Sequence, residues 1–89
     1  MLLEWNVAHI AKHDVTRLEA EQIFTNDHAV RQTYGNRLLV FGMTEQERVL
    51  AIILHPKPES RYYVVSARPA NRQERRDYQQ ELNEGGDAA

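Results

Sequence analysis

The spacing of apolar residues changes along the chain from a helical repeat to an alternating one. In the first 25 residues the apolar positions recur every three or four residues, whereas from about residue 29 they alternate or form short runs. We place a first helix at residues 5–13 and begin a second within "VTRLEAEQIF", where Thr16 and Glu19 have the spacing of a capping box. The residues of this second helix that are expected to face the core are Leu18, Ala20, Ile23 and Phe24.

Four strands and a last helix follow. We place the strands at residues 29–34, 37–44, 48–55 and 61–68, with connections short enough for an antiparallel meander. The stretch "VLAIIL" is apolar on both faces, so its strand is expected at the centre of the sheet. Pro69 ends the last strand, and Asn71 with Glu74 forms a second capping box for a helix through about Leu82. The predicted fold class is α+β, in the order ααββββα with a four-stranded antiparallel sheet.

The last helix has few apolar residues. Only Tyr78 and Leu82, one turn apart, form a strip that could face the core, while Asp77 and Glu81 are placed to repel each other. A helix is normally held by the packing of an apolar face, and here that face is narrow. The cations on another side of the helix therefore predict that it binds an anion. The side chains that cluster there are Arg72, Arg75, Arg76 and Gln79.

Length and composition limit the class of protein. A chain of 89 residues has room for one domain, which we place at residues 1–83, with a disordered acidic tail at residues 84–89. The chain has no cysteine, which excludes disulfides and thiolate metal sites, and its apolar runs are too short to cross a membrane. We expect a cytoplasmic protein without a signal peptide.

Charge is unevenly distributed along the chain. The formal net charge is −2, but residues 61–76 contain five arginines and a single acid, Glu74, and so carry a charge of +4. Screening limits the reach of a charge to about 10 Å or less, so this local excess is a better guide to partners than the total.

The arginines are candidates for phosphate chemistry. Arg68 ends a strand just before the helix that carries Arg72 and Arg75, and guanidinium groups that meet there would bind a phosphate and stabilise a pentacoordinate transition state. Tyr78 would anchor the helix in the core, contact a phosphate or base, or do both. The residues expected to extend this phosphate-binding surface are Arg61, Arg72, Arg76 and His55.

The histidines offer proton transfer rather than a metal site. His9 and His13 are four residues apart, but no carboxylate with ligand spacing completes a set, so no metal is assigned. His13 beside Lys12 is better suited to acid and base chemistry. The sequence has no glycine-rich phosphate loop, cysteine nucleophile or Gly-x-Ser-x-Gly turn, which argues against the use of nucleotide triphosphates and against acyl transfer.

Two stretches together resemble one known family. "WNVAHIAKHDVTRLEAEQIF" and "VVSARPANRQERRDY" are similar to motifs of the BrnT family, bacterial toxins of type II toxin–antitoxin systems. The chain departs from the family at Asp14, Arg17 and Pro69, where glycine, an aromatic residue and lysine are usual, and Asp14 would have to adopt the positive φ of a glycine. The residues that carry the likeness are Trp5, Lys12, His13, Val15, Glu19, Ala20 and Phe24, then Ser66, Ala67, Arg68, Ala70, Glu74, Arg75 and Tyr78.

The resemblance implies a RelE-like fold and an endoribonuclease that inhibits translation and needs neither metal nor cofactor. Arg68 and Arg75 would stabilise charge on the phosphate, while Lys12, His13 and Tyr78 would transfer protons or position the RNA. The implied partners are an RNA substrate and a cognate small DNA-binding antitoxin in a hetero-oligomer; the chain itself is not expected to bind DNA or a membrane.

Two alternatives without cleavage stay open. In the first, residues 61–76 form a protein-binding surface for an acidic or disordered partner. In the second, the chain is a sequence-tolerant RNA-binding module, which the small number of exposed aromatic residues disfavours. Cleavage of RNA separates both alternatives from the ribonuclease.

Overall fold

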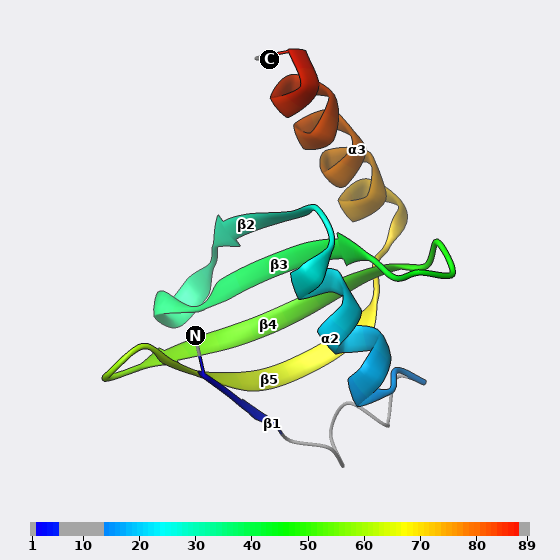
Figure 1. Ribbon diagram of the computed structural model, residues 1–89. Coiled ribbons are helices and arrows are strands. Elements are labelled where there is room, and N and C mark those ends of the chain that lie inside the picture. Colours follow the sequence, from blue (N-terminus) through cyan, green and yellow to red (C-terminus); the bar gives the residue numbers. More distant parts are fainter. Residues whose placement is uncertain (1, 6–13, 88–89) are drawn as a thin grey trace.

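The computed structural model describes residues 2–5 and 14–87, and within them five strands form one sheet with two α-helices (Figure 1). A short 3-10 turn, Tyr34–Asn36, joins the second and third strands. No helix in this part of the chain is long and apolar enough to cross a membrane. The elements are β1 (Leu2–Trp5), α2 (Arg17–Thr25), β2 (His28–Gln32), β3 (Leu38–Met43), β4 (Val49–Lys57), β5 (Arg61–Pro69) and α3 (Arg72–Asp87).

The sheet has the strand order β1-β5-β4-β3-β2. Strands β2 to β5 pair antiparallel with their sequence neighbours, which confirms the predicted meander. Strand β4 lies in the middle, as its continuous apolar run predicted, because a strand flanked on both edges and covered on both faces needs apolar residues on each. Its Leu50, Ala51 and Ile52 are all fully buried.

The predicted four-stranded antiparallel sheet with three helices is wrong. A fifth strand, β1, pairs parallel with β5, from Leu2 opposite Arg61 to Trp5 opposite Val64, so the sheet is mixed. Trp5, which we placed in a first helix, lies in this strand, and the remainder of that helix, residues 6–13, falls outside the described residues. The strand was missed because four residues are too few to show a period, and because its partner lies more than 50 residues away.

Helix α2 begins at the predicted capping box. The Thr16 hydroxyl accepts the Glu19 N–H at 3.1 Å, and the Glu19 carboxylate accepts the Thr16 N–H at 3.1 Å. Ala20 and Ile23 face the core as expected, but Leu18 is 66% exposed, so its assignment to the core was wrong. Residues two apart lie about 200° apart around a helix, so Leu18 and Ala20 cannot share one face. Just before the helix Asp14 has the expected positive φ, of 58°.

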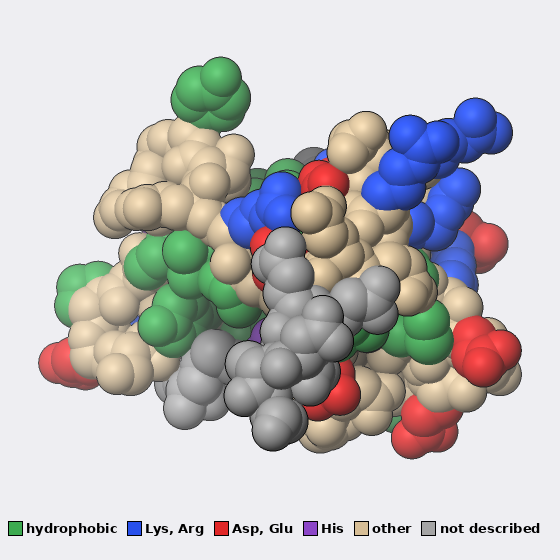
Figure 2. Space-filling model, turned by 90° about the horizontal axis from the view of Figure 1, so that it is seen from above, with side chains coloured by type: hydrophobic (Ala, Val, Ile, Leu, Met, Phe, Trp, Pro, Cys, Tyr) green, Lys and Arg blue, Asp and Glu red, His purple; other side chains and the backbone are tan. Residues whose placement is uncertain are grey.

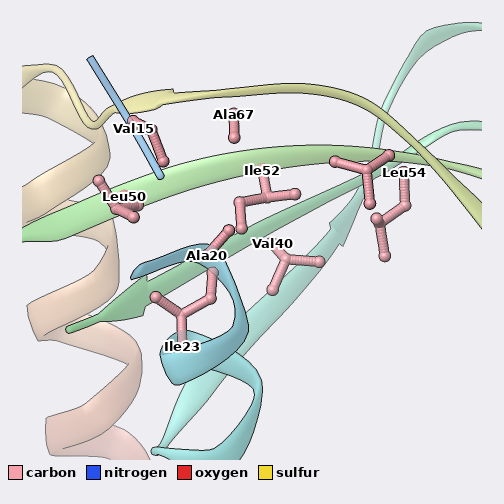
Figure 3. Packing of buried hydrophobic residues seen from close by; sticks show 9 residues of the cluster. Val15, Ala20, Ile23, Val40, Leu50, Ile52, Leu54 and Ala67 are labelled. Atoms are coloured by element: carbon pink, nitrogen blue, oxygen red, sulfur yellow. The ribbon is translucent and has the colours of Figure 1, made fainter. Parts of the chain in front are cut away.

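The two helices cover opposite faces of the sheet. Successive strand residues point to opposite sides, so Val40 and Ile52 face α2 whereas Phe41 and Ala51 face α3. The core on the α2 side, shown in Figure 3, is the larger of the two; its buried members are Val15, Ala20, Ile23, Val40, Leu50, Ile52, Leu54, Val64 and Ala67. On the other side Tyr78 of α3 packs with Phe41 and Ala51, and Leu82 packs against them, which confirms the predicted apolar strip of this helix.

Helix α3 is also held by an ion-pair network that the sequence did not reveal. Arg31 of β2 donates to Asp77 at 3.2 Å and to Glu81 at 2.8 Å, so the two acids expected to repel each other share a cation. Arg31 is 42% exposed, so water and salt screen these ion pairs. The network therefore orients α3 on the sheet more than it stabilises the fold. The sequence placed the end of this helix near Leu82 and a disordered tail at residues 84–89, whereas α3 continues to Asp87.

Gly42 of β3 sets how closely α2 approaches the sheet. A Cβ at this position would lie 2.4 Å from the Ile23 Cβ and 3.2 Å from the Ile23 Cα. We predict that Gly42→Ala lowers the free energy of unfolding by about 1–3 kcal/mol, because the helix backbone has to move. Urea unfolding followed by circular dichroism measures the loss. The exposed Leu18→Ala serves as a control with an effect of about 0.5 kcal/mol, and equal stability of Gly42→Ala and wild type would contradict the close approach.

Candidate functional site

Three arginines of α3 share one hollow on the surface of the helix. They lie at i, i+3 and i+4 spacing, are all exposed, and with two glutamines line a hollow of about 450 Å³. Figure 2 shows Lys and Arg side chains gathered at one edge of the face that it presents. The lining residues are Arg72, Arg75, Arg76, Gln79 and Gln80.

Position on the helix strengthens the positive potential of this hollow. Asn71 caps α3, because its side-chain oxygen accepts the Glu74 N–H at 2.8 Å, and Arg72 is the first helical residue. The N-terminal end of a helix carries a partial positive charge, so the arginines of the first turn add to it. Arg75 donates to the Ala70 carbonyl at 3.0 Å, whereas Arg72 and Arg76 have no hydrogen bond or ion pair with any residue that the structure describes. Anions are therefore the expected ligands of this hollow.

Arg68 does not line the hollow. Its two terminal nitrogens donate to the two carboxylate oxygens of Glu74, at 2.5 and 2.7 Å, and Glu74 also accepts the Asn71 N–H at 2.9 Å. The hydrogen bond from Arg68 holds the pKa of Glu74 below its ordinary value of 4.5, and Glu74 raises the pKa of Arg68 in turn. Both groups are thus charged at neutral pH and neutralise each other. The structure brings Arg72, Arg75 and Arg76 together but separates Arg68 from them.

Arg61 and His55 lie at the other end of the sheet. Arg61 begins β5 and Arg68 lies near its end, so about 3.3 Å of rise per residue puts their Cα atoms about 23 Å apart, beyond the reach of screened charges. Arg61 donates to Glu4 at 3.4 Å, and Lys57 donates to the same carboxylate at 2.9 Å. His55 faces Tyr63 across the β4–β5 pair, and its Nδ1 is buried without a hydrogen-bond partner among the described residues. Residues 61–76 are therefore two separate groups of charges.

Tyr78 is a core residue whose hydroxyl is hydrogen-bonded within the fold. It is 3% exposed, and its hydroxyl donates to the Asp27 carbonyl at 3.1 Å. Burial raises the pKa of Tyr78, and the nearby charge of Asp27 raises it further. An anchoring role is consistent with this environment, while the raised pKa makes the hydroxyl a weaker acid than an ordinary tyrosine.

The two candidates for proton transfer near the start of the chain, Lys12 and His13, fall outside the described residues, as does His9. Within the part that the structure describes, no three His, Asp or Glu side chains are grouped so that they could hold a metal ion. Of the residues that line the arginine hollow, the sequence missed only Gln80. Gln80 could have been found from the sequence, because it lies four residues after Arg76 and this spacing puts both side chains on one face of the helix.

Comparison with known proteins adds no relative. No protein-family model matches the chain, and no curated protein matches it to a significant degree. The likeness to the BrnT family therefore depends on the two quoted stretches alone.

The Arg68–Glu74 pair predicts a specific response to acid. Because the folded-state pKa of Glu74 is depressed, the stabilisation from this pair is complete above the ordinary pKa of 4.5 and is lost as the pH falls through the folded-state value. We predict that Glu74→Gln lowers the free energy of unfolding by about 2 kcal/mol at pH 7, and that its difference from wild type shrinks below pH 4.5.

Urea unfolding of both proteins between pH 7 and pH 3 measures this difference. Glu4 and Glu19, whose pKa values are also lowered, titrate in both proteins and cancel in the comparison. The exposed Glu59→Gln removes the same charge elsewhere and should change stability little at any pH. A Glu74→Gln difference that stays constant with pH would contradict the assigned pair.

Proposed function

We propose that this chain is a metal-independent endoribonuclease toxin of a type II toxin–antitoxin system, with the phosphates of RNA bound on α3. The observation that carries the proposal is the hollow lined by Arg72, Arg75 and Arg76 at the N-terminal end of a capped helix. Guanidinium groups bind phosphate through paired N–H donors and stay charged at every physiological pH. The resemblance to BrnT supplies the remainder: cleavage, a cytoplasmic location and neutralisation by a small DNA-binding antitoxin.

Cleavage would proceed by transesterification at one phosphate. A base takes the proton of the 2′-OH, the O2′–P bond forms while the P–O5′ bond breaks, and an acid protonates O5′, which leaves a 2′,3′-cyclic phosphate and a 5′-hydroxyl. Arg75 would stabilise the extra negative charge on phosphorus, and the residues proposed for the proton transfers are Lys12 and His13. Tyr78 is better suited to positioning, because its hydroxyl is bound to Asp27.

A second candidate, a protein-binding module without cleavage, is favoured by one observation. Arg68, the arginine that the resemblance makes catalytic, is bound on both terminal nitrogens by Glu74 and is only 32% exposed. The remaining arginines would then attract an acidic partner chain rather than act on a phosphate. Binding and cleavage experiments separate the two functions.

RNA binding should depend on the arginines of α3. We predict that Arg72→Ala/Arg76→Ala weakens binding of single-stranded RNA and lowers the slope of log K against log salt concentration by about 1.4, because two phosphate contacts are lost at about 0.7 each. Fluorescence anisotropy of a labelled oligonucleotide at several salt concentrations measures both. The control Arg17→Ala/Arg37→Ala removes the same charge from other exposed positions, and an equal loss in both variants would contradict a local site.

Cleavage should survive removal of metals. We predict that wild type cleaves RNA in excess chelator and leaves 2′,3′-cyclic phosphate ends, which mass spectrometry identifies. The variant that tests the Arg68–Glu74 pair in cleavage is Arg68→Gln/Glu74→Gln, because it removes both charges without leaving Glu74 buried and unpaired. A folded double variant that still binds RNA but cleaves at least a hundredfold more slowly would show that cleavage needs the Arg68–Glu74 pair. RNA that is bound but stays intact with wild type would favour the RNA-binding module, and RNA that is neither bound nor cleaved would favour the protein-binding module.

A further inference from the structure

A second hollow, of about 430 Å³, is lined in part by two other residues of α3, Tyr78 and Leu82. It opens between the chain that follows α2, the end of β3 and helix α3. Met43 and Leu82 supply apolar surface to its lining beside the buried Tyr78, and Asn26 and Asp27 are among its polar residues. A flat ring could lie against such a surface while its edge meets the polar groups.

Two side chains of this hollow already donate hydrogen bonds within the fold, whereas the Asp27 carboxylate is open to a ligand. The Asn26 amide donates to the Met43 carbonyl at 2.9 Å, and the Tyr78 hydroxyl donates to the Asp27 carbonyl. The side chain of Asp27 is exposed and accepts no hydrogen bond from any residue that the structure describes. An ionised carboxylate only accepts hydrogen bonds, so a ligand that fits here has to present donors.

The two hollows adjoin along α3. Arg75 and Gln79 line the arginine hollow, and Tyr78 and Leu82, each three residues further along, line the second one. Residues three apart are neighbours on a helix surface. The arginine hollow therefore borders directly on the second hollow, which has a hydrogen-bond acceptor at its rim. This is the juxtaposition that a nucleotide requires, with its phosphate on one side and the donor edge of its base on the other.

We propose that the hollow at Asp27 receives a base of the bound RNA and selects bases that carry an amino group over uracil. The proposal rests on RNA binding by the arginines of α3. Cytosine offers its N4 amino group to a carboxylate, whereas uracil presents a carbonyl oxygen at the same place, and two acceptors repel. Asp27 is thereby a specificity-determining residue that acts on base identity rather than on the phosphate.

The test compares two RNAs that differ only at this edge. Oligocytidylate and oligouridylate of equal length, 2′-O-methylated so that they cannot be cleaved, are titrated with the full chain and followed by fluorescence anisotropy. Wild type should bind the cytosine RNA about tenfold more tightly. In Asp27→Asn the ratio should fall close to one, because an amide accepts from cytosine and donates to uracil equally well. The substitution spares the backbone carbonyl that holds Tyr78.

General electrostatics predicts a different result. Loss of one negative charge near a polyanion strengthens binding of both RNAs alike and leaves the ratio unchanged. Glu59→Gln, in the turn between β4 and β5 at the other end of the sheet, should change the binding of neither RNA. Arg72→Ala/Arg76→Ala should weaken both RNAs without altering the ratio. Thermal unfolding verifies that each variant is folded.

The outcomes separate the two proposals. A tenfold ratio in wild type that Asp27→Asn abolishes supports the base site whether or not unmodified RNA is cleaved. Equal binding of the two RNAs by wild type, or a preference that Asp27→Asn leaves unchanged, overturns the base site while RNA binding stands. If neither RNA binds, both proposals fail together.

Discussion

The carboxylate of Glu74 joins the sheet to the last helix, and the candidate site depends on that junction. It accepts the backbone N–H of Asn71, which completes the cap of α3, and both terminal nitrogens of Arg68 at the end of β5. One buried acid therefore determines where the helix begins and which arginine is neutralised. The rest of the helix follows from this start, with Tyr78 turned into the core and the remaining arginines turned outward.

The arginines of the chain fall into two groups, those paired with a carboxylate inside the fold and those available to a ligand. Arg31, Arg61 and Arg68 each meet a carboxylate within the fold and hold elements together. Arg72 and Arg76 meet none among the described residues, so their charge is available to a ligand. Compensated cations add little potential at the surface, whereas two uncompensated ones at a helix N-terminus add to its dipole. The chain is thus nearly neutral overall yet presents one clearly cationic surface.

Local patterns identified most of the elements. Both capping boxes, at Thr16 and at Asn71, lie where the spacing of Thr or Asn and Glu placed them, because such a cap involves only residues three apart. The meander and its central strand were likewise readable, since short connections force neighbours to pair. What could not be read was the pairing of β1 with β5, which joins residues more than 50 apart. The exposure of Leu18 was readable but missed, because residues two apart lie about 200° apart around a helix.

The sequence by itself determined that an arginine-rich helix follows the last strand, that Asn71 and Glu74 cap it, and that Tyr78 and Leu82 face inward. These features depend on neighbours within one or two turns. Only the tertiary structure decided that Glu74 takes Arg68 rather than another arginine, that Arg31 joins Asp77 and Glu81, and that Asp27 borders a hollow beside the arginines. Each of these contacts depends on how a side chain extends once the sheet and the helix are packed, and no spacing along the chain encodes that direction.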